Sequence, residues 1–205
     1  MREQVVSSFL LLAGTAGVLV PVTLLLGVLL ALQAAPWFSW TVNALSDLGI
    51  PPGSGLFFNG AMVCAGVLLL LFSLGVRIRV SRTAGMMLSL AAVMLVGVGL
   101  VSERAFWVHW VISGSFFFLL VGTFLFFWFH TSVHDKMFMK SSRGLCGIAV
   151  VSTGWFWFFP GAAVPEVCVL VPAFFWCAWV GVVILIMPAL AQKKTLRQST
   201  PAISG

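Results

Sequence analysis

The chain has 205 residues, of which 61% are hydrophobic and only 8% are charged, and its mean hydropathy is +1.13. A soluble domain carries about 25% charged residues, so this composition excludes a soluble globular protein and makes the lipid bilayer the solvent. The net charge is +6, but the basic residues stand in short segments between apolar runs. That pattern is typical of membrane orientation and not of nucleic-acid binding, so we expect membrane lipids, and no nucleic acid, as partners.

Six apolar runs follow one another along the chain, each long enough to cross about 30 Å of hydrocarbon as a helix. They cover residues 8–32, 56–76, 83–102, 107–130, 144–162 and 167–190. The runs do not alternate with polar residues, which favours helices over a membrane barrel. The predicted fold class is therefore all-α: a polytopic bundle of six transmembrane helices forming one domain, 1–192, with a basic, disordered cytoplasmic tail, 193–205. The first run is too long for the apolar core of a signal peptide, so we expect it to be retained as a span.

The lysines and arginines predict how these spans are oriented. Ten of them fall on one side of a six-span chain, and one falls on the other. The ten are Arg2, Arg77, Arg79, Arg82, Lys136, Lys140, Arg143, Lys193, Lys194 and Arg197, and the single one is Arg104. Because basic residues remain on the cytoplasmic side, we expect a multi-pass protein of the cell membrane with its N-terminus and C-terminus in the cytoplasm.

The first outer connection, residues 33–55, has no lysine or arginine and is not typical of a solvated loop. Four polar residues share one face of a helix over residues 39–48: Ser39, Asn43, Ser46 and Asp47. This pattern predicts a structured loop with a short helix lying in the membrane interface. Asn59, one turn inside the second span, needs a polar partner within the bundle.

Polar residues gather at the predicted outer side, where a site can form. The candidate ligand-binding residues are Asn43, Ser46, Asp47, Asn59, Arg104 and His109. One hypothesis is structural: Ser46 and Asp47 cap helices, and Asp47 pairs with Arg104 or His109, which ties the loop to the bundle.

A second hypothesis is catalytic, with Ser46, Asp47 and His109 as the candidates. Asp47 would orient His109, and His109 would deprotonate Ser46 or a water for attack on a lipid ester or amide. A metal site would combine Asp47 and His109 with Glu103 or Glu166, but one histidine among acids is weak support for zinc. We therefore predict no metal and no cofactor.

The motif Asn-Ala-Leu-Ser-Asp-Leu-Gly at residues 43–49, followed by Leu-Phe-Phe-Asn-Gly at 56–60, resembles the domain of unknown function 998 family. His109 at the start of the fourth span also fits that pattern. The family is distantly similar to the six-span group that contains the FRAG1 and DRAM proteins. The resemblance covers most of the chain and implies the fold and topology, but it implies no activity.

The favoured interpretation of the function is a membrane protein that engages lipid or another amphiphile at its extracytoplasmic mouth. The alternative is an intramembrane lipid hydrolase, and a third class is a small-solute transporter. Transporters place polar groups near the bilayer midplane, whereas the centres of these spans are almost purely apolar. Self-association into a homo-oligomer remains open from the sequence.

Reporter fusions test the predicted orientation. A reporter inserted beside Asp47 is expected to face the outer compartment, and one beside Lys136 the cytoplasm, because an odd number of spans separates the two positions in the six-span chain. A reporter pair that faces the same compartment would contradict the predicted threading.

Overall fold

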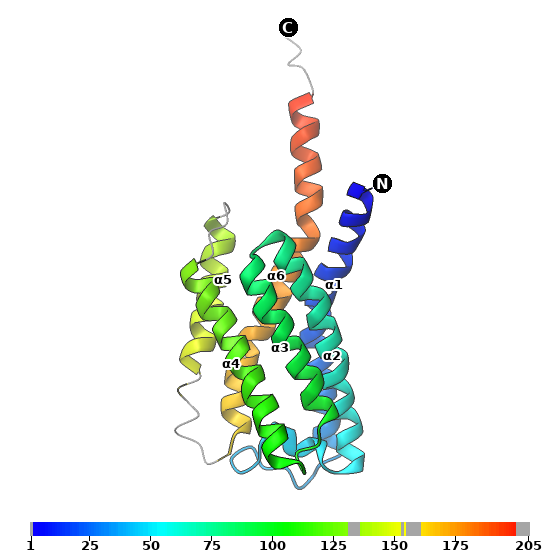
Figure 1. Cartoon of the computed structure of the whole chain (residues 1–205), viewed down its shortest axis with the longest axis vertical. Helices are drawn as coiled ribbons and strands as arrows, with labels where there is room; N and C mark the ends of the chain where they lie inside the picture. The colour runs from blue at the N-terminus through cyan, green and yellow to red at the C-terminus, as the bar shows by residue number, and fades with distance from the viewer. Residues whose placement is uncertain (1, 131–135, 153, 155–160, 200–205) are drawn as a thin grey trace.

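The computed structural model describes residues 2–130, 136–152, 154 and 161–199. Within them the chain is all-α, without a strand. The helices are α1 (Arg2–Gln33), α2 (Pro52–Arg79), α3 (Arg82–Leu100), α4 (Phe106–His130), α5 (Lys136–Ser152) and α6 (Ala163–Ser199), and a short 3-10 helix, η1 (Leu45–Gly49), lies between α1 and α2. The six α-helices run along the long axis of the molecule as a bundle (Figure 1).

Five of these helices, α1, α2, α3, α4 and α6, are long and apolar enough to cross a membrane. Their positions overlap the predicted runs, although α1 begins at Arg2 and not at residue 8, and α6 ends at Ser199 and not at residue 190. The chain is thus an α-helical membrane protein, as its composition predicts. α6 continues to Ser199, so the helix extends into the region predicted as a tail, whose last residues, 200–205, lie outside the described residues.

The fifth predicted span, 144–162, differs from the structure. α5 begins earlier, at Lys136, and ends at Ser152. A helix of 17 residues is about 25 Å long, and its first half contains Lys140 and Arg143, so it is shorter and more polar than the other five. Residues 153 and 155–160 of the predicted span lie outside the described residues.

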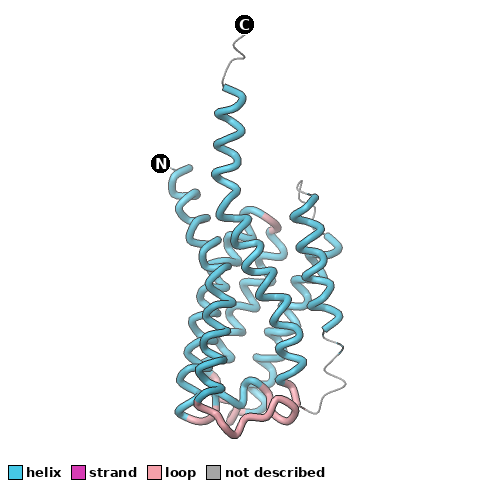
Figure 2. Tube along the Cα trace, turned by 180° about the vertical axis from the view of Figure 1, so that it is seen from behind, coloured by secondary structure: helices cyan, strands magenta, loops and turns pink. Residues whose placement is uncertain are grey.

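The two ends of the bundle differ in character. Both ends of the described chain lie at one end, called here the terminal end, together with the start of α5 (Figure 1). The loops at 34–51, 101–105 and 161–162 gather at the opposite end, called here the loop end (Figure 2). Segments far apart in the sequence therefore meet at the loop end.

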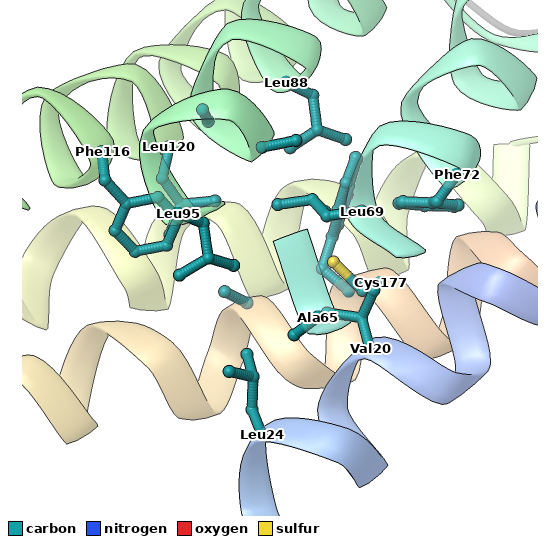
Figure 3. Packing of buried hydrophobic residues seen from close by; sticks show 14 of the residues in the cluster. Val20, Leu24, Ala65, Leu69, Phe72, Leu88, Leu95, Phe116, Leu120 and Cys177 are labelled. Carbon is teal, nitrogen blue, oxygen red and sulfur yellow. The ribbon is translucent and has the colours of Figure 1, made fainter. Parts of the chain in front are cut away.

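The core of the bundle contains an aromatic cluster around Trp176 of α6. The ring of this fully buried residue lies 6.0 Å from that of Phe72, 5.4 Å from Phe124 and 5.6 Å from Phe127, all in edge-on orientations. Such edge-to-face pairs are favourable beyond the area they bury. The cluster joins α2, α4 and α6, and aliphatic side chains continue the packing along the bundle axis (Figure 3).

Small residues set the close approach of α1 to its neighbours. A Cβ added to Gly27 of α1 would overlap the Ala61 Cβ of α2, and one added to Gly75 of α2 would lie 2.6 Å from the Ala13 Cβ of α1. On the other side of α1, a Cβ on Gly14 would lie 2.8 Å from the Gly181 carbonyl oxygen of α6. In a membrane, where apolar burial does not drive helices together, such contacts allow dense interhelical packing.

Replacement of Gly27 by alanine tests this packing. Gly27→Ala is expected to destabilise the bundle by about 1–3 kcal/mol, because the added methyl group forces α1 away from α2. Gly60→Ala is the matched control, since a Cβ at Gly60 meets no atom within 4 Å and alanine favours the helix equally at both positions. Thermal unfolding in detergent measures both variants, and equal midpoints would contradict the proposed close packing.

Candidate functional site

The loop between α1 and α2 is built on turns and the 3-10 helix η1. The short helix predicted over residues 39–48 is therefore present only from Leu45, and its first part is wrong. The Asp47 carboxylate explains the difference, because its Oδ2 accepts hydrogen bonds from Asn43 Nδ2 at 2.8 Å and from the Ala44 amide at 3.0 Å. Asn43 Oδ1 in turn accepts from the Ser39 amide at 2.9 Å. These local bonds use the side chains to satisfy backbone groups and compete with a regular helix.

Three further hydrogen bonds tie this loop to the bundle. The Leu45 amide donates to Glu166 Oε2 at 2.8 Å, and the Ala163 amide donates to the Asn43 carbonyl oxygen at 3.0 Å. On the other side of η1, Asn59 Nδ2 donates to the Gly49 carbonyl oxygen at 3.0 Å. The sequence predicts a partner for Asn59 within the bundle, and the structure instead gives it the Gly49 carbonyl oxygen of the loop. We call these three bonds the loop clasp.

His109 lies in the first turn of α4 and is almost fully buried, with 4% of its surface exposed. Its Nδ1 lies 2.6 Å from the Val101 carbonyl oxygen. A carbonyl oxygen only accepts, so Nδ1 carries the proton and Nε2 is an acceptor in the neutral ring. Nε2 is buried and has no hydrogen-bond partner.

The predicted pairing of Asp47 with His109 or Arg104 is therefore wrong. The Val101 carbonyl oxygen takes the place on His109 that the carboxylate would need. The Arg104 side chain is exposed and forms no ion pair within the described part of the chain. Asp47 instead serves the loop in which it lies, and it lies close to Glu103.

Glu103, in the loop between α3 and α4, brings a second carboxylate to the same place. Burial raises the pKa of this carboxyl group above its ordinary value, a hydrogen bond with Ser46 and the proximity of His109 lower it, and the negative charge of Asp47 raises it. The net direction is upward. Its Oε2 atom is buried without a hydrogen-bond partner, so Glu103 and His109 each present an unpaired acceptor.

These groups surround a cavity of about 370 Å³ at the loop end, called here the polar cavity. Its polar lining comes from Ser46 of η1, Glu103, His109 and Ser113 of α4, and Glu166 of α6. The remaining lining residues are Ala44, Phe106, Trp110, Gly114, Phe117 and Ala162. Apart from the polar groups, the cavity therefore has an aromatic wall, and no lysine or arginine is among the described residues that line it.

The polar cavity adjoins apolar space inside the bundle. Ser46, Ser113, Phe117 and Glu166 also line a narrow inner cavity of about 60 Å³, whose other described walls are aliphatic and aromatic. Leu24, Leu95 and Phe116, which point toward the bundle axis in Figure 3, belong to that inner cavity.

A third space continues from the inner cavity toward the outside of the bundle. Leu24, Leu45 and Phe174 are shared between the inner cavity and an apolar groove of about 510 Å³ between α1 and α6. The three spaces thus lie in series, and the serine and glutamate residues that line the first two are absent from the described lining of the groove.

The structure brings together two of the predicted site residues, Ser46 and His109, at the polar cavity. Asn43, Asp47 and Asn59 lie in the loop and its contacts to the bundle, and Arg104 is not among the residues that line the cavity. The ligand-binding site as predicted omits Glu103 and Glu166. Their position at the predicted outer ends of spans, in a chain with five acidic residues, was the available signal.

Metal chemistry gains no support from this geometry. Within the described ranges, no group of three histidine, cysteine, aspartate or glutamate residues is placed to hold a metal ion.

Stability as a function of pH tests the burial of Glu103. A carboxyl group with a raised pKa binds its proton more tightly in the folded than in the unfolded chain. Its stabilising contribution is present below the ordinary value of 4.5 and is lost as the pH rises through the raised pKa. Glu103→Gln is thus expected to unfold at a higher temperature than wild type at neutral pH.

The difference between the two proteins should shrink as the pH falls toward 4.5, the ordinary value. Asp47, His109 and Glu166 also face this group, and the comparison with the variant separates Glu103 from them. A difference in midpoint that stays constant across this range would contradict a raised pKa.

The model of the family described as "Protein of unknown function (DUF998)" matches residues 18–186, which includes η1, α2 to α5, and the loop clasp. No curated protein and no solved structure matches the chain. The more distant similarity to the FRAG1 and DRAM group stays a prediction. The match covers most of the chain, which therefore belongs to the DUF998 family of proteins of unknown function.

Proposed function

We propose that this protein binds a lipid or another amphiphile at its loop end, with the head group in the polar cavity and the apolar tail in the spaces that continue from it. One observation carries the proposal: the polar cavity, the inner cavity and the α1–α6 groove share lining residues in series. A binding site for an amphiphile needs a few polar groups at one end for the head group and apolar walls beyond them for the tail.

The dimensions agree with this division. The inner cavity of about 60 Å³ is too narrow for a whole acyl chain, but the α1–α6 groove adds about 510 Å³ and is lined by apolar residues. The groove lies between two helices that are apolar enough to span the membrane. A tail that enters the groove would therefore remain among apolar groups along its length.

We also propose that the protein crosses the cell membrane six times and has both termini in the cytoplasm. This orientation makes the loop end extracytoplasmic. The α5 helix starts at the terminal end and α6 starts at the loop end (Figure 1), and this supports a sixth crossing between them. The ten basic residues at the terminal side of that topology support the orientation.

Hydrolysis of a lipid is the second candidate, and His109 favours it. The Val101 carbonyl oxygen holds Nδ1, so Nε2 is the ring nitrogen left for proton transfer, and His109 lines the same cavity as Ser46. Asp47 would then have no orienting role. A fluorophosphonate that labels Ser46 would favour this alternative over binding alone. A solute path is the third candidate, and the apolar walls of the inner cavity weigh against it.

Blocking the junction of the two cavities tests binding. Ser113 lines both the polar and the inner cavity, so Ser113→Phe is expected to lower the occupancy of co-purified lipid at least about tenfold, equivalent to 1.4 kcal/mol. Native mass spectrometry of the purified protein measures the bound adducts.

Val111→Phe is the control for that experiment. Val111 lies on the same helix with 56% of its surface exposed, so the same new side chain points away from the cavities. Its occupancy should match that of wild type. If Ser113→Phe retains its fold and carries as much lipid as the control, the proposed site is wrong.

A further inference from the structure

The polar cavity holds acceptors that lack donors. His109 is almost fully buried, its Nδ1 is held by the Val101 carbonyl oxygen, and its Nε2 on the far side of the ring has no partner. Glu103 Oε2 is buried and unpaired as well. A buried polar atom without a partner is costly, and both residues line one cavity. A ligand that satisfies both must supply hydrogen-bond donors.

Carboxyl groups stand at the cavity without a lysine or arginine beside them. Glu103 and Glu166 line it, and the charge of Asp47 acts on both of them. No lysine or arginine is among the described lining residues, and the nearby Arg104 is exposed. In surroundings of low dielectric constant, this arrangement attracts a cation and repels a phosphate or sulfate group.

The aromatic wall suits a cation in the same position. Phe106, Trp110 and Phe117 line the cavity beside the acidic residues, and the face of an aromatic ring attracts a positively charged group. This contact by itself does not separate a primary amine from a quaternary ammonium. The unpaired Nε2 and Oε2 atoms favour the primary amine over the quaternary ammonium, because only the protonated primary amine has N–H donors.

We infer that the polar cavity selects an amphiphile whose head is a protonated primary amine without a phosphate group. The ammonium donates to His109 Nε2 and Glu103 Oε2, and Glu166 brings a second carboxyl group to the same cavity. The apolar chain leaves through the inner cavity toward the α1–α6 groove. This inference rests on the proposed function and adds the chemical class of the head group to it.

A series of head groups on one tail tests the inference. The protein is placed in nanodiscs of phosphatidylcholine and titrated with hexadecylamine, hexadecyltrimethylammonium, hexadecanol and hexadecyl phosphate. Hexadecylamine supplies charge and donors, the trimethylammonium compound supplies charge alone, the alcohol supplies one donor without charge, and the phosphate has the opposite charge. Quenching of tryptophan fluorescence reports binding, since Trp110 lines the cavity.

Wild type is expected to bind hexadecylamine at least about tenfold more tightly than each of the other three probes. Glu103→Gln removes the charge and should bring the affinity for the amine close to that for the alcohol. Arg104→Gln changes the charge of the adjacent, exposed residue and should keep the preference for the amine. If Glu103→Gln fails to fold, the wild-type ranking of the four probes still decides the outcome.

The outcomes separate the two proposals. If hexadecyl phosphate binds as tightly as the amine, or if Glu103→Gln retains the wild-type preference, the primary-amine inference is wrong while amphiphile binding stands. Equal binding of all four probes would also overturn the inference, since water would then satisfy the acceptors. If none of the probes binds, the proposed function itself fails. Native mass spectrometry of the co-purified adducts distinguishes a membrane lipid from an added amphiphile as the source of the amine.

Discussion

The hydrogen bond from the Leu45 amide to the Glu166 carboxylate joins positions 121 residues apart, and the loop end is organised around it. Backbone groups at the edge of a membrane must find partners, because the hydrocarbon offers none. The loop between α1 and α2 meets this requirement with Asp47 inside the loop, with Glu166 from α6 and with Asn59 from α2. The loop is thereby fixed across the bundle end, and η1 forms one wall of the polar cavity.

The same requirement explains why so few charged residues are enough to create a polar site. The chain has five acidic residues, and three of them, Asp47, Glu103 and Glu166, meet at the loop end. Two of the three satisfy backbone amides there. Once α3, α4 and α6 bring their ends together, a carboxylate that holds the loop also faces the cavity behind it. A structural contact and a wall of the polar cavity therefore come from the same residue.

The spans of the bundle could be predicted from the sequence, because a membrane helix requires a long apolar run and little else. α1, α2, α3, α4 and α6 follow from that rule. α5 does not, since its first half contains Lys140 and Arg143 and a rule based on hydropathy places the span later. Close contacts such as that between Gly27 and Ala61 depend on how the helices face one another, and spacing along one helix does not give this.

The polar residues of the site could be predicted only in part. Their shared side of the membrane indicated that they would be near one another, but it did not indicate which atoms would pair. The partner of His109 Nδ1 is a backbone carbonyl oxygen, and every residue carries one, so no side-chain pattern reveals it. The Asp47 carboxylate was expected to bind the His109 ring. It accepts from the Ala44 amide instead, because that amide is only three positions away in the chain and the bond forms within the loop.

Local and long-range bonds therefore divide the acceptors into two kinds. Asp47 Oδ2 and Glu166 Oε2 are occupied by backbone amides, so changes at these residues act first on the fold of the loop. His109 Nε2 and Glu103 Oε2 accept no hydrogen bond from a backbone amide, although the fold holds both residues in place. A buried acceptor that folding leaves unpaired costs stability, and a donor from a ligand recovers it. For that reason we expect these two atoms, and not the more numerous polar groups of the clasp, to determine which ligand head group binds.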